Sequence, residues 1–322
     1  MMKLGYHISH EQFSPADLLR YVKKAEEAGF QFALSSDHFH PWNNDQGHSG
    51  FAWAWLGAAM AQTDLNFGVV NCPAYRYHPA IIAQAAATLD NMFPDRFWMA
   101  IGSGQALNEA INGEHWPARE ERNNRLKEAA DIMETLWRGD SVTRHGVIKV
   151  EEAKLYTLPQ RKIPLIGAAI TPDTAAWLAT WADGMITISQ PVQQLQKVVD
   201  AWKNNGGENK PMVLKVQVSY DKSDEEAVKG AHEQWKTNVF GSDMLAELRT
   251  PLQFEQAAMH VKPEELHGHV NMSSDPGRHI DWLNQYMEMG FYELSIHNVN
   301  KKQEQFIDAF GEKIIPELMV TH

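Results

Sequence analysis

The side chains best suited to chemistry are concentrated in residues 36–42, which read Ser-Asp-His-Phe-His-Pro-Trp. An imidazole such as that of His38 exchanges protons near neutral pH, and the indole of Trp42 offers a flat apolar wall. These two residue types close together favour acid–base catalysis beside a planar ligand. The alternative is structural, with His38 capping a strand end and Trp42 packing. The spacing alone leaves both interpretations open.

The same segment also admits a metal site. His38 and His40 are separated by one residue, as are side chains that share one face of a strand, and such a pair can hold zinc in barrel hydrolases. A metal-dependent hydrolase would need further His, Lys or Asp ligands at the ends of later strands. The three later strand ends at 102–104, 167–169 and 187–189 supply none. We therefore expect no metal, and this hydrolase is the weaker enzymatic interpretation.

A glycine-rich turn follows the fourth predicted strand. Gly102-Ser103-Gly104 resembles the start of a dinucleotide fingerprint, but Leu107 stands where the third glycine belongs, so a nicotinamide-binding Rossmann domain does not fit. The turn can expose backbone N–H groups to an anion or a flavin ring. It can equally be no more than a tight connection between a strand and a helix.

Short strands that alternate with amphipathic helices must position these residues. Prolines at positions 15, 79 and 276 predict three helix starts. Eight parallel strands with helices between them predict a closed (β/α)₈ TIM barrel, an α/β fold whose active site lies at the C-terminal ends of the strands. The predicted strands span residues 3–9, 30–36, 65–71, 97–103, 163–169, 184–189, 212–220 and 292–299.

Two segments are longer than ordinary connections in such a fold. Residues 140–160 predict a hairpin around His145-Gly146, and residues 234–268 predict either a lid over the active site or a helical region that only packs. No linker-like composition interrupts the chain. We expect one domain over residues 1–322, with insertions at about 140–160 and 234–268.

Composition excludes several partners. The net charge of −12 provides no basic field for nucleic acid or anionic lipid, and no apolar run reaches the roughly 18 residues that span a bilayer. Cys72 is the only cysteine, so the 322 residues contain no internal disulfide. The first residues do not resemble a secretion signal. These features predict a cytoplasmic protein.

Five segments taken together resemble one known group of enzymes. They are residues 4–15, 36–42, 75–97, 101–109 and 273–276. They resemble the coenzyme F-420-dependent glucose-6-phosphate dehydrogenase group of the luciferase-like monooxygenase superfamily over nearly the whole chain. The resemblance implies a (β/α)₈ barrel, usually a homodimer, that holds a flavin or deazaflavin and a small-molecule substrate at the C-terminal face. A flavin reductase is a candidate partner.

The resemblance also assigns roles to residues. His38 matches the histidine that takes a proton from the substrate alcohol, and Trp42 matches the aromatic residue that shields the reacting centre. A non-proline cis peptide that supports the cofactor ring is expected near Val69-Val70-Asn71. The expected cofactor-binding residues are Asp37, Val70, Asn71, Ser103, Gly104, Asn108, Ile170 and Thr171.

Three departures limit what the resemblance implies. Gln105 replaces the family's catalytic glutamate, and an amide does not donate that proton. Ile170-Thr171 replaces paired glycines that hold the cofactor phosphate. The lysines that hold the sugar phosphate are replaced around Gln190, Gln193 and His267, so glucose 6-phosphate is a poor candidate substrate.

These departures shape the functional expectation. We expect a flavin- or deazaflavin-dependent oxidoreductase acting on a small, mostly uncharged organic substrate. FMN is slightly ahead of F-420 because Gln105 can offer an N–H to an anionic reduced flavin without transferring a proton. The alternatives are the metal-dependent hydrolase of His38 and His40 and a catalytically silent flavin-binding paralogue.

Overall fold

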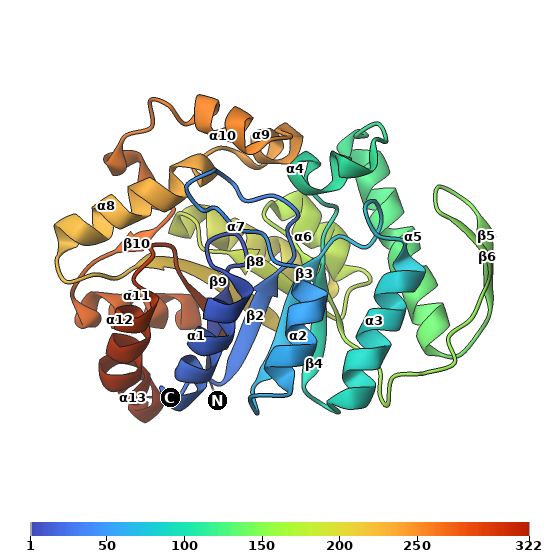
Figure 1. The fold of residues 1–322 in the computed structure, drawn as a ribbon, viewed down its shortest axis with the longest axis horizontal. Coiled ribbons are helices and arrows are strands. Elements are labelled where there is room, and N and C mark those ends of the chain that lie inside the picture. Colours follow the sequence, from blue (N-terminus) through green and yellow to red (C-terminus); the bar gives the residue numbers. More distant parts are fainter. Residues whose placement is uncertain (1, 322) are drawn as a thin grey trace.

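A computed structural model describes residues 2–321 and shows eight parallel strands closed into a barrel, with helices around it (Figure 1). The strands follow the order β11-β1-β2-β3-β4-β7-β8-β9, and pairing of β8 with β9 completes the ring. The barrel strands are β1 (Lys3–Ile8), β2 (Phe32–Ser36), β3 (Asn66–Asn71), β4 (Phe97–Ile101), β7 (Leu165–Ala168), β8 (Gly184–Ile188), β9 (Met212–Ser219) and β11 (Glu293–Asn298). The predicted (β/α)₈ barrel is confirmed, and each strand lies within its predicted range.

The helices lie outside the strands and begin where proline predicts them. The prolines at 15, 79 and 276 each occupy a first helical position, and the preceding residue caps the helix, as when Ser14 accepts a hydrogen bond from the backbone N–H of Asp17. The α-helices are α1 (Pro15–Glu27), α2 (Ala52–Met60), α3 (Pro79–Met92), α4 (Ala106–Glu109), α5 (Arg119–Trp137), α6 (Pro172–Ala179), α7 (Val192–Trp202), α8 (Asp224–Trp235), α9 (Ser242–Glu247), α10 (Pro251–Ala257), α11 (Pro276–Glu288), α12 (Gln303–Ala309) and α13 (Ile315–Thr321).

Apolar side chains fill one layer of the inside of the barrel. Glycines make room for the largest of them: a Cβ added to Gly5 would lie 2.3 Å from the Phe32 ring, and one added to Gly68 would lie 2.3 Å from the Trp98 ring. We call the buried apolar residues inside the barrel the plug, and they are Phe32, Leu34, Ala100, Ile166, Ile186 and Val213. The plug forms the floor on which a site at the C-terminal strand ends can rest.

The two long segments take different forms. Residues 140–160 contain an antiparallel hairpin of β5 (Val142–His145) and β6 (Lys149–Ala153), which stands outside the barrel next to α5 (Figure 1). The short strand β10 (Asn271–Met272) adds to β9 outside the closed ring.

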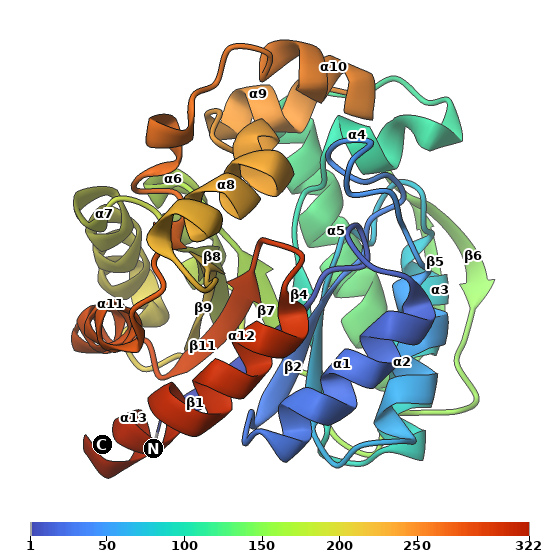
Figure 2. The same ribbon diagram turned by 60° about the vertical axis from the view of Figure 1, so that its left-hand side comes forward.

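Residues 234–268 form α9, α10 and short connecting turns above the C-terminal strand ends (Figure 2). We call these elements with the end of α8 the cap. It has a hydrophobic core of its own, separate from that of the barrel, which includes Trp42, Leu107, Trp235, Phe254, Leu266 and Val270.

The expected cis peptide near Val69-Val70-Asn71 is wrong. All peptide bonds among the described residues are trans. Strand β3 stays in regular parallel register with β4 as far as Asn71, which pairs with Ile101, so no bulge interrupts it. Among residues 2–321, no helix combines the length and apolar character that crossing a bilayer requires.

Candidate active site

A cavity of about 310 Å³ opens above the plug and below the cap. Its walls come from strand ends and following loops around most of the barrel. All the predicted site residues except Thr171 border it, namely Asp37, His38, Trp42, Val70, Asn71, Ser103, Gly104, Gln105, Asn108 and Ile170. The structure therefore brings residues that are far apart in the sequence to one place.

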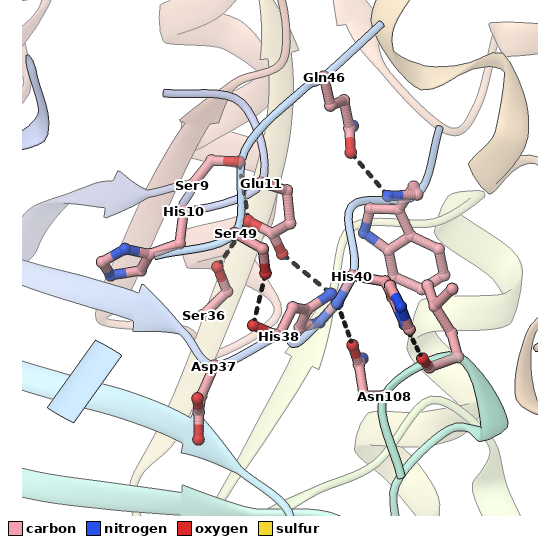
Figure 3. Close-up of polar contacts among 12 residues, drawn as sticks. Ser9, His10, Glu11, Ser36, Asp37, His38, His40, Gln46, Ser49 and Asn108 are labelled. Atoms are coloured by element: carbon pink, nitrogen blue, oxygen red, sulfur yellow. Dashed lines mark hydrogen bonds and ion pairs between the residues drawn. The ribbon is translucent and has the colours of Figure 1, made fainter. Parts of the chain in front are cut away.

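His38 is oriented by a carboxylate from the loop after β1. Glu11 Oε1 lies 3.1 Å from His38 Nδ1, and Glu11 Oε2 accepts hydrogen bonds from Ser9 and Ser36 at 3.0 and 2.8 Å (Figure 3). On the main-chain side, Ser49 Oγ donates to the His38 carbonyl at 2.7 Å. Hydrogen bonds thus fix the loop, while the ring lies within ion-pair distance of Glu11 without a hydrogen bond at Nδ1.

The electrostatics of this pair favour a neutral base. Burial lowers the pKa of His38, and Arg76 and Lys215 act in the same direction, while Glu11 raises it against them. Burial raises the pKa of Glu11, but His38, Lys215 and hydrogen bonds outweigh it, so that this pKa is lowered overall. A carboxylate at Nδ1 favours the tautomer with the proton there, which leaves Nε2 as a proton acceptor.

Trp42 is held in place by the cap. Its ring lies 5.2 Å from His38 and 5.3 Å from Phe254 of α10, in edge-to-face contact with the latter. Its backbone N–H donates to Gln46 Oε1 at 2.9 Å. The cap therefore positions one wall of the cavity.

His40 does not join His38 around a common point. Its Nδ1 lies 2.7 Å from the Leu107 carbonyl oxygen, and the residue does not border the cavity. Asn108 Oδ1 accepts from the backbone N–H groups of Phe39 and His40 and turns this part of the loop away. No group of three His, Cys, Asp or Glu side chains among the described residues converges as metal ligands would. The geometry therefore gives the hydrolase interpretation no support.

Asp37 is the centre of a buried ionic network. Its carboxylate lies 3.1 Å from Arg76 Nη2 and accepts hydrogen bonds from Asn71 Nδ2 at 2.6 Å and Tyr77 at 3.1 Å. Arg76 also contacts Glu109 at 2.9 Å. Burial raises the pKa of Glu109 to about 7, although Arg76 works to lower it. The network places a second protonatable carboxyl group on the wall of the cavity.

The wall formed by β3 and β4 offers hydrogen-bonding groups without partners. Asn71 Oδ1 is buried and accepts no hydrogen bond, and Ser103 and Gly104 form none with the rest of the described chain. Gly104 has a positive φ of 82°, and a Cβ there would lie 2.8 Å from Cys72 Sγ. Only glycine fits this turn. Such a wall fits the edge and face of a flat polar ring system.

Thr171 lies beyond the cavity and caps α6. Its hydroxyl accepts from the Thr174 N–H at 3.4 Å, and Arg119 Nη2 donates to the hydroxyls of Thr171 and Thr174 at 2.8 and 2.7 Å. Ile170, the preceding residue, borders the cavity. A helix N-terminus with an arginine beside it is suited to an anion.

Five charged residues at or beside the site were not among the sequence predictions. They are Glu11, Arg76, Glu109, Arg119 and Lys215. Lys215 had a signal in the sequence, because a charged residue interrupts the apolar residues of its strand. The partners of the other four come from distant parts of the chain, which local spacing does not reveal.

Gln190, Gln193 and His267, which the resemblance leads us to expect in place of phosphate-binding lysines, lie outside the active-site cavity. Gln190 and His267 line a second cavity, which also contains Arg278. Arg278 lies 3.8 Å from Asp224, which partly offsets its charge. Gln193 lies exposed in α7 and borders neither of these cavities.

Comparisons with known proteins agree with this architecture. An F-420-dependent glucose-6-phosphate dehydrogenase of Microbacterium testaceum is 34% identical over 98% of this chain and 97% of its own length. The solved structure of an F-420-dependent secondary alcohol dehydrogenase, in complex with an F-420–acetone adduct, superposes with a TM-score of 0.89 at 29% identity and covers 98% of both chains. An FMN complex of a type II Baeyer–Villiger monooxygenase from Pseudomonas putida has a TM-score of 0.72 at 14% identity, covering 98% of both chains, and shares the fold.

Residues 2–293 match the luciferase-like monooxygenase family. Together with the full-length relatives and the closed barrel, this match shows that the chain belongs to that family and is a flavin- or deazaflavin-dependent oxidoreductase.

Proposed function

We propose that this enzyme oxidises a small secondary alcohol with the deazaflavin coenzyme F-420 as hydride acceptor. The observation that carries the proposal is the pair of His38 and Glu11, which presents a neutral imidazole at the edge of the cavity. A base of this kind suits removal of the hydroxyl proton of an alcohol.

The cofactor would lie against the wall of β3, β4 and β7. Asn71, Ser103 and Gly104 would contact its ring, since their polar groups lack partners within the described chain. Arg119 and the N-terminus of α6 would hold its phosphate.

F-420 is better supported than FMN, which the sequence alone placed slightly ahead. The relatives at 34% and 29% identity are named for F-420, whereas the FMN protein is similar at the level of the fold. Gln105 does not donate the proton that the family's glutamate supplies, and this argued against F-420. Glu109 borders the same cavity, and burial raises its pKa to about 7, so a carboxyl group that can donate a proton is present on that wall. A flavin reductase as partner would apply only to use of FMN.

The chain's own groups account for the rest of the reaction. His38 Nε2 would accept the hydroxyl proton, while Glu11 keeps the ring oriented through Nδ1. Trp42, backed by Phe254, would exclude water from the reacting carbon. Bound F-420 would supply the acceptor for the hydride that leaves the same carbon, so that alcohol becomes ketone.

The test combines two titrations and two variants. Apo-protein titrated with F-420 and with FMN should bind F-420 more tightly, and a secondary alcohol such as 2-butanol should reduce it. Replacement of His38 by Ala should lower turnover by roughly 10²-fold or more. His40→Ala is the matched control, because its ring does not border the cavity, and it should stay near wild-type activity.

Other outcomes would redirect the assignment. Equal losses in both variants with activity that depends on zinc would favour the hydrolase. Tight cofactor binding without turnover would favour a silent paralogue, and reduction of FMN alone would overturn F-420. Glucose 6-phosphate should show no saturable oxidation. The resemblance places Gln190, Gln193 and His267 where the dehydrogenases have lysines that bind the sugar phosphate.

A further inference from the structure

Lys215 is a cation on the inside of the barrel. It lies on β9 two residues after Val213 of the plug, and its strand neighbours in register are Ile188 of β8 and Ser295 of β11. Side chains two residues apart on a strand share a face, so Lys215 lies one layer above the plug. It borders the same cavity as His38.

The ammonium group of Lys215 has no anionic partner in direct contact. Among residues 2–321, no carboxylate oxygen lies within 4.0 Å of Lys215 Nζ and no acceptor forms a hydrogen bond with it. Its ammonium group lies 5.4 Å from the centroid of the Trp235 ring. Glu11, the acid that acts on it at longer range, is already engaged by Ser9, Ser36 and His38.

Lys215 is partly buried, and an unpaired charge that is partly withdrawn from water is costly, so such a group indicates a binding role. The rest of its surroundings offer no compensation. His7 and His297 lie ring to ring at 4.4 Å, and burial lowers the pKa of both, which keeps them neutral beside Lys215. A bound anion would supply the missing partner.

The position of Lys215 separates it from the cofactor wall. In the closed ring, β9 lies diametrically opposite β3, while the residues expected to hold the cofactor lie on β2, β3, β4 and β7 or directly after them. A flat cofactor against that wall would leave the space between it and Lys215 to the substrate. His38 borders this space from the end of β2.

We propose that Lys215 binds a carboxylate group of the substrate, which makes the substrate a short hydroxy acid rather than an uncharged alcohol. The proposal rests on the function proposed above and names its substrate class. One ammonium group matches one monoanion, whereas a phosphate dianion would need more cationic partners than this wall provides. The carboxylate is fixed at Lys215, and the carbinol group is left to His38.

The ionisation of Lys215 is consistent with this role. Burial lowers the pKa of Lys215 to about 8, against Glu11, which raises it. The other titratable groups that face it are His7, His38 and His297, and all three have lowered pKa values. The ammonium form predominates below pH 8, so carboxylate binding should weaken as the pH rises through that value.

The experiment measures binding, so that it does not depend on turnover. Calorimetric titrations with 2-hydroxybutyrate and with neutral 2-butanol are carried out on the protein alone and on the protein loaded with reduced F-420, which cannot accept a hydride. Lys215→Met should raise the Kd for 2-hydroxybutyrate by about tenfold or more, the size expected when a charge-assisted contact is lost, and should reduce discrimination against 2-butanol. Lys229→Met, on the exposed face of α8, removes the same charge as a matched control and should leave the Kd unchanged.

Lys215→Arg guards against misfolding of the first variant and should retain part of the affinity. An unchanged Kd in Lys215→Met, or no binding of the anion to the wild type, would overturn the proposal. So would an effect of the substitution on F-420 affinity alone, which would assign Lys215 to the cofactor. In each of these cases, oxidation of 2-butanol that depends on His38 would still uphold the proposed function.

Discussion

At the scale of single residues, the chemistry depends on how Glu11 holds His38. The Glu11 carboxylate is 3.1 Å from His38 Nδ1, and among the nearby charges it raises the pKa of His38 most strongly. It therefore has two effects, since it orients the ring and sets the pH at which the ring becomes a base.

Glu11→Gln separates these two effects. Removal of the negative charge leaves burial, Arg76 and Lys215 to lower the pKa of His38 further. The acidic limb of the profile of kcat/KM against pH should therefore move to lower pH, while kcat falls by roughly tenfold or more because the ring is less well held. Glu27→Gln at the exposed end of α1 is the control. An acidic limb that stays in place, or moves to higher pH, would show that Glu11 does not act on His38.

Residue types at strand ends predicted much of the cavity wall. His38, Trp42 and Gln105 follow predicted strands directly, and the barrel brings such positions together. Arg119 escaped prediction because its place beside Thr171 results from the packing of two helices, which no local pattern encodes. Thr171 itself lies outside the cavity, because the chain turns into α6 at that point.

At the scale of elements, the barrel depends on close fits across neighbouring strands. Gly68 of β3 leaves space for the Trp98 ring of β4, which pairs with it in register. Overpacking a site of this kind costs stability because the surrounding strands cannot move apart.

Gly68→Ala should lower the free energy of unfolding by about 1–3 kcal/mol. Gly57→Ala in α2 is the matched control, since a Cβ there meets nothing within 4 Å. It should stabilise by about 0.5–1 kcal/mol through reduced freedom of the unfolded chain. Urea denaturation of both variants measures the difference. Equal stabilities would contradict the close fit.

Strands and helix starts were accessible from the sequence because alternation and proline act locally. The cap helices α9 and α10 were not accessible, since the sequence of residues 234–268 has no clear periodicity. Their apolar side chains are buried through contacts with residues far away in the sequence, such as Trp42 and Leu107. The expected cis peptide came from resemblance, and all peptide bonds among the described residues are trans.

At the scale of the whole molecule, the described residues form three hydrophobic clusters, and two of them, the cap core and the plug, contribute side chains to the active-site cavity. The cap core contains Phe254 and Trp42, whereas the barrel is stabilised by its own plug and by the helices around it. The loop that carries His38 is attached to both, through β2 and through Trp42.

Phe254→Ala should loosen the cap without unfolding the barrel. The Phe254 ring is fully buried, and loss of such a side chain lowers the free energy of unfolding of the unit it packs in by about 3–5 kcal/mol. Hydrogen exchange should become faster in residues 235–270 and stay slow in the barrel strands, while activity falls with the loss of support for Trp42. Met259→Ala, exposed in the same segment, is the control. Uniformly faster exchange over the chain would show that cap and barrel unfold as one unit.

The separate core of the cap has a consequence for how substrate preference evolves in related enzymes. Substitutions in residues 234–268 can reshape the roof over the substrate while the barrel, its plug and the cofactor wall stay intact. The stability of the barrel therefore imposes little constraint on changes in selectivity. Related enzymes that have acquired new substrates should therefore have diverged most in this stretch, and grafting it between them should transfer preference without rebuilding the fold.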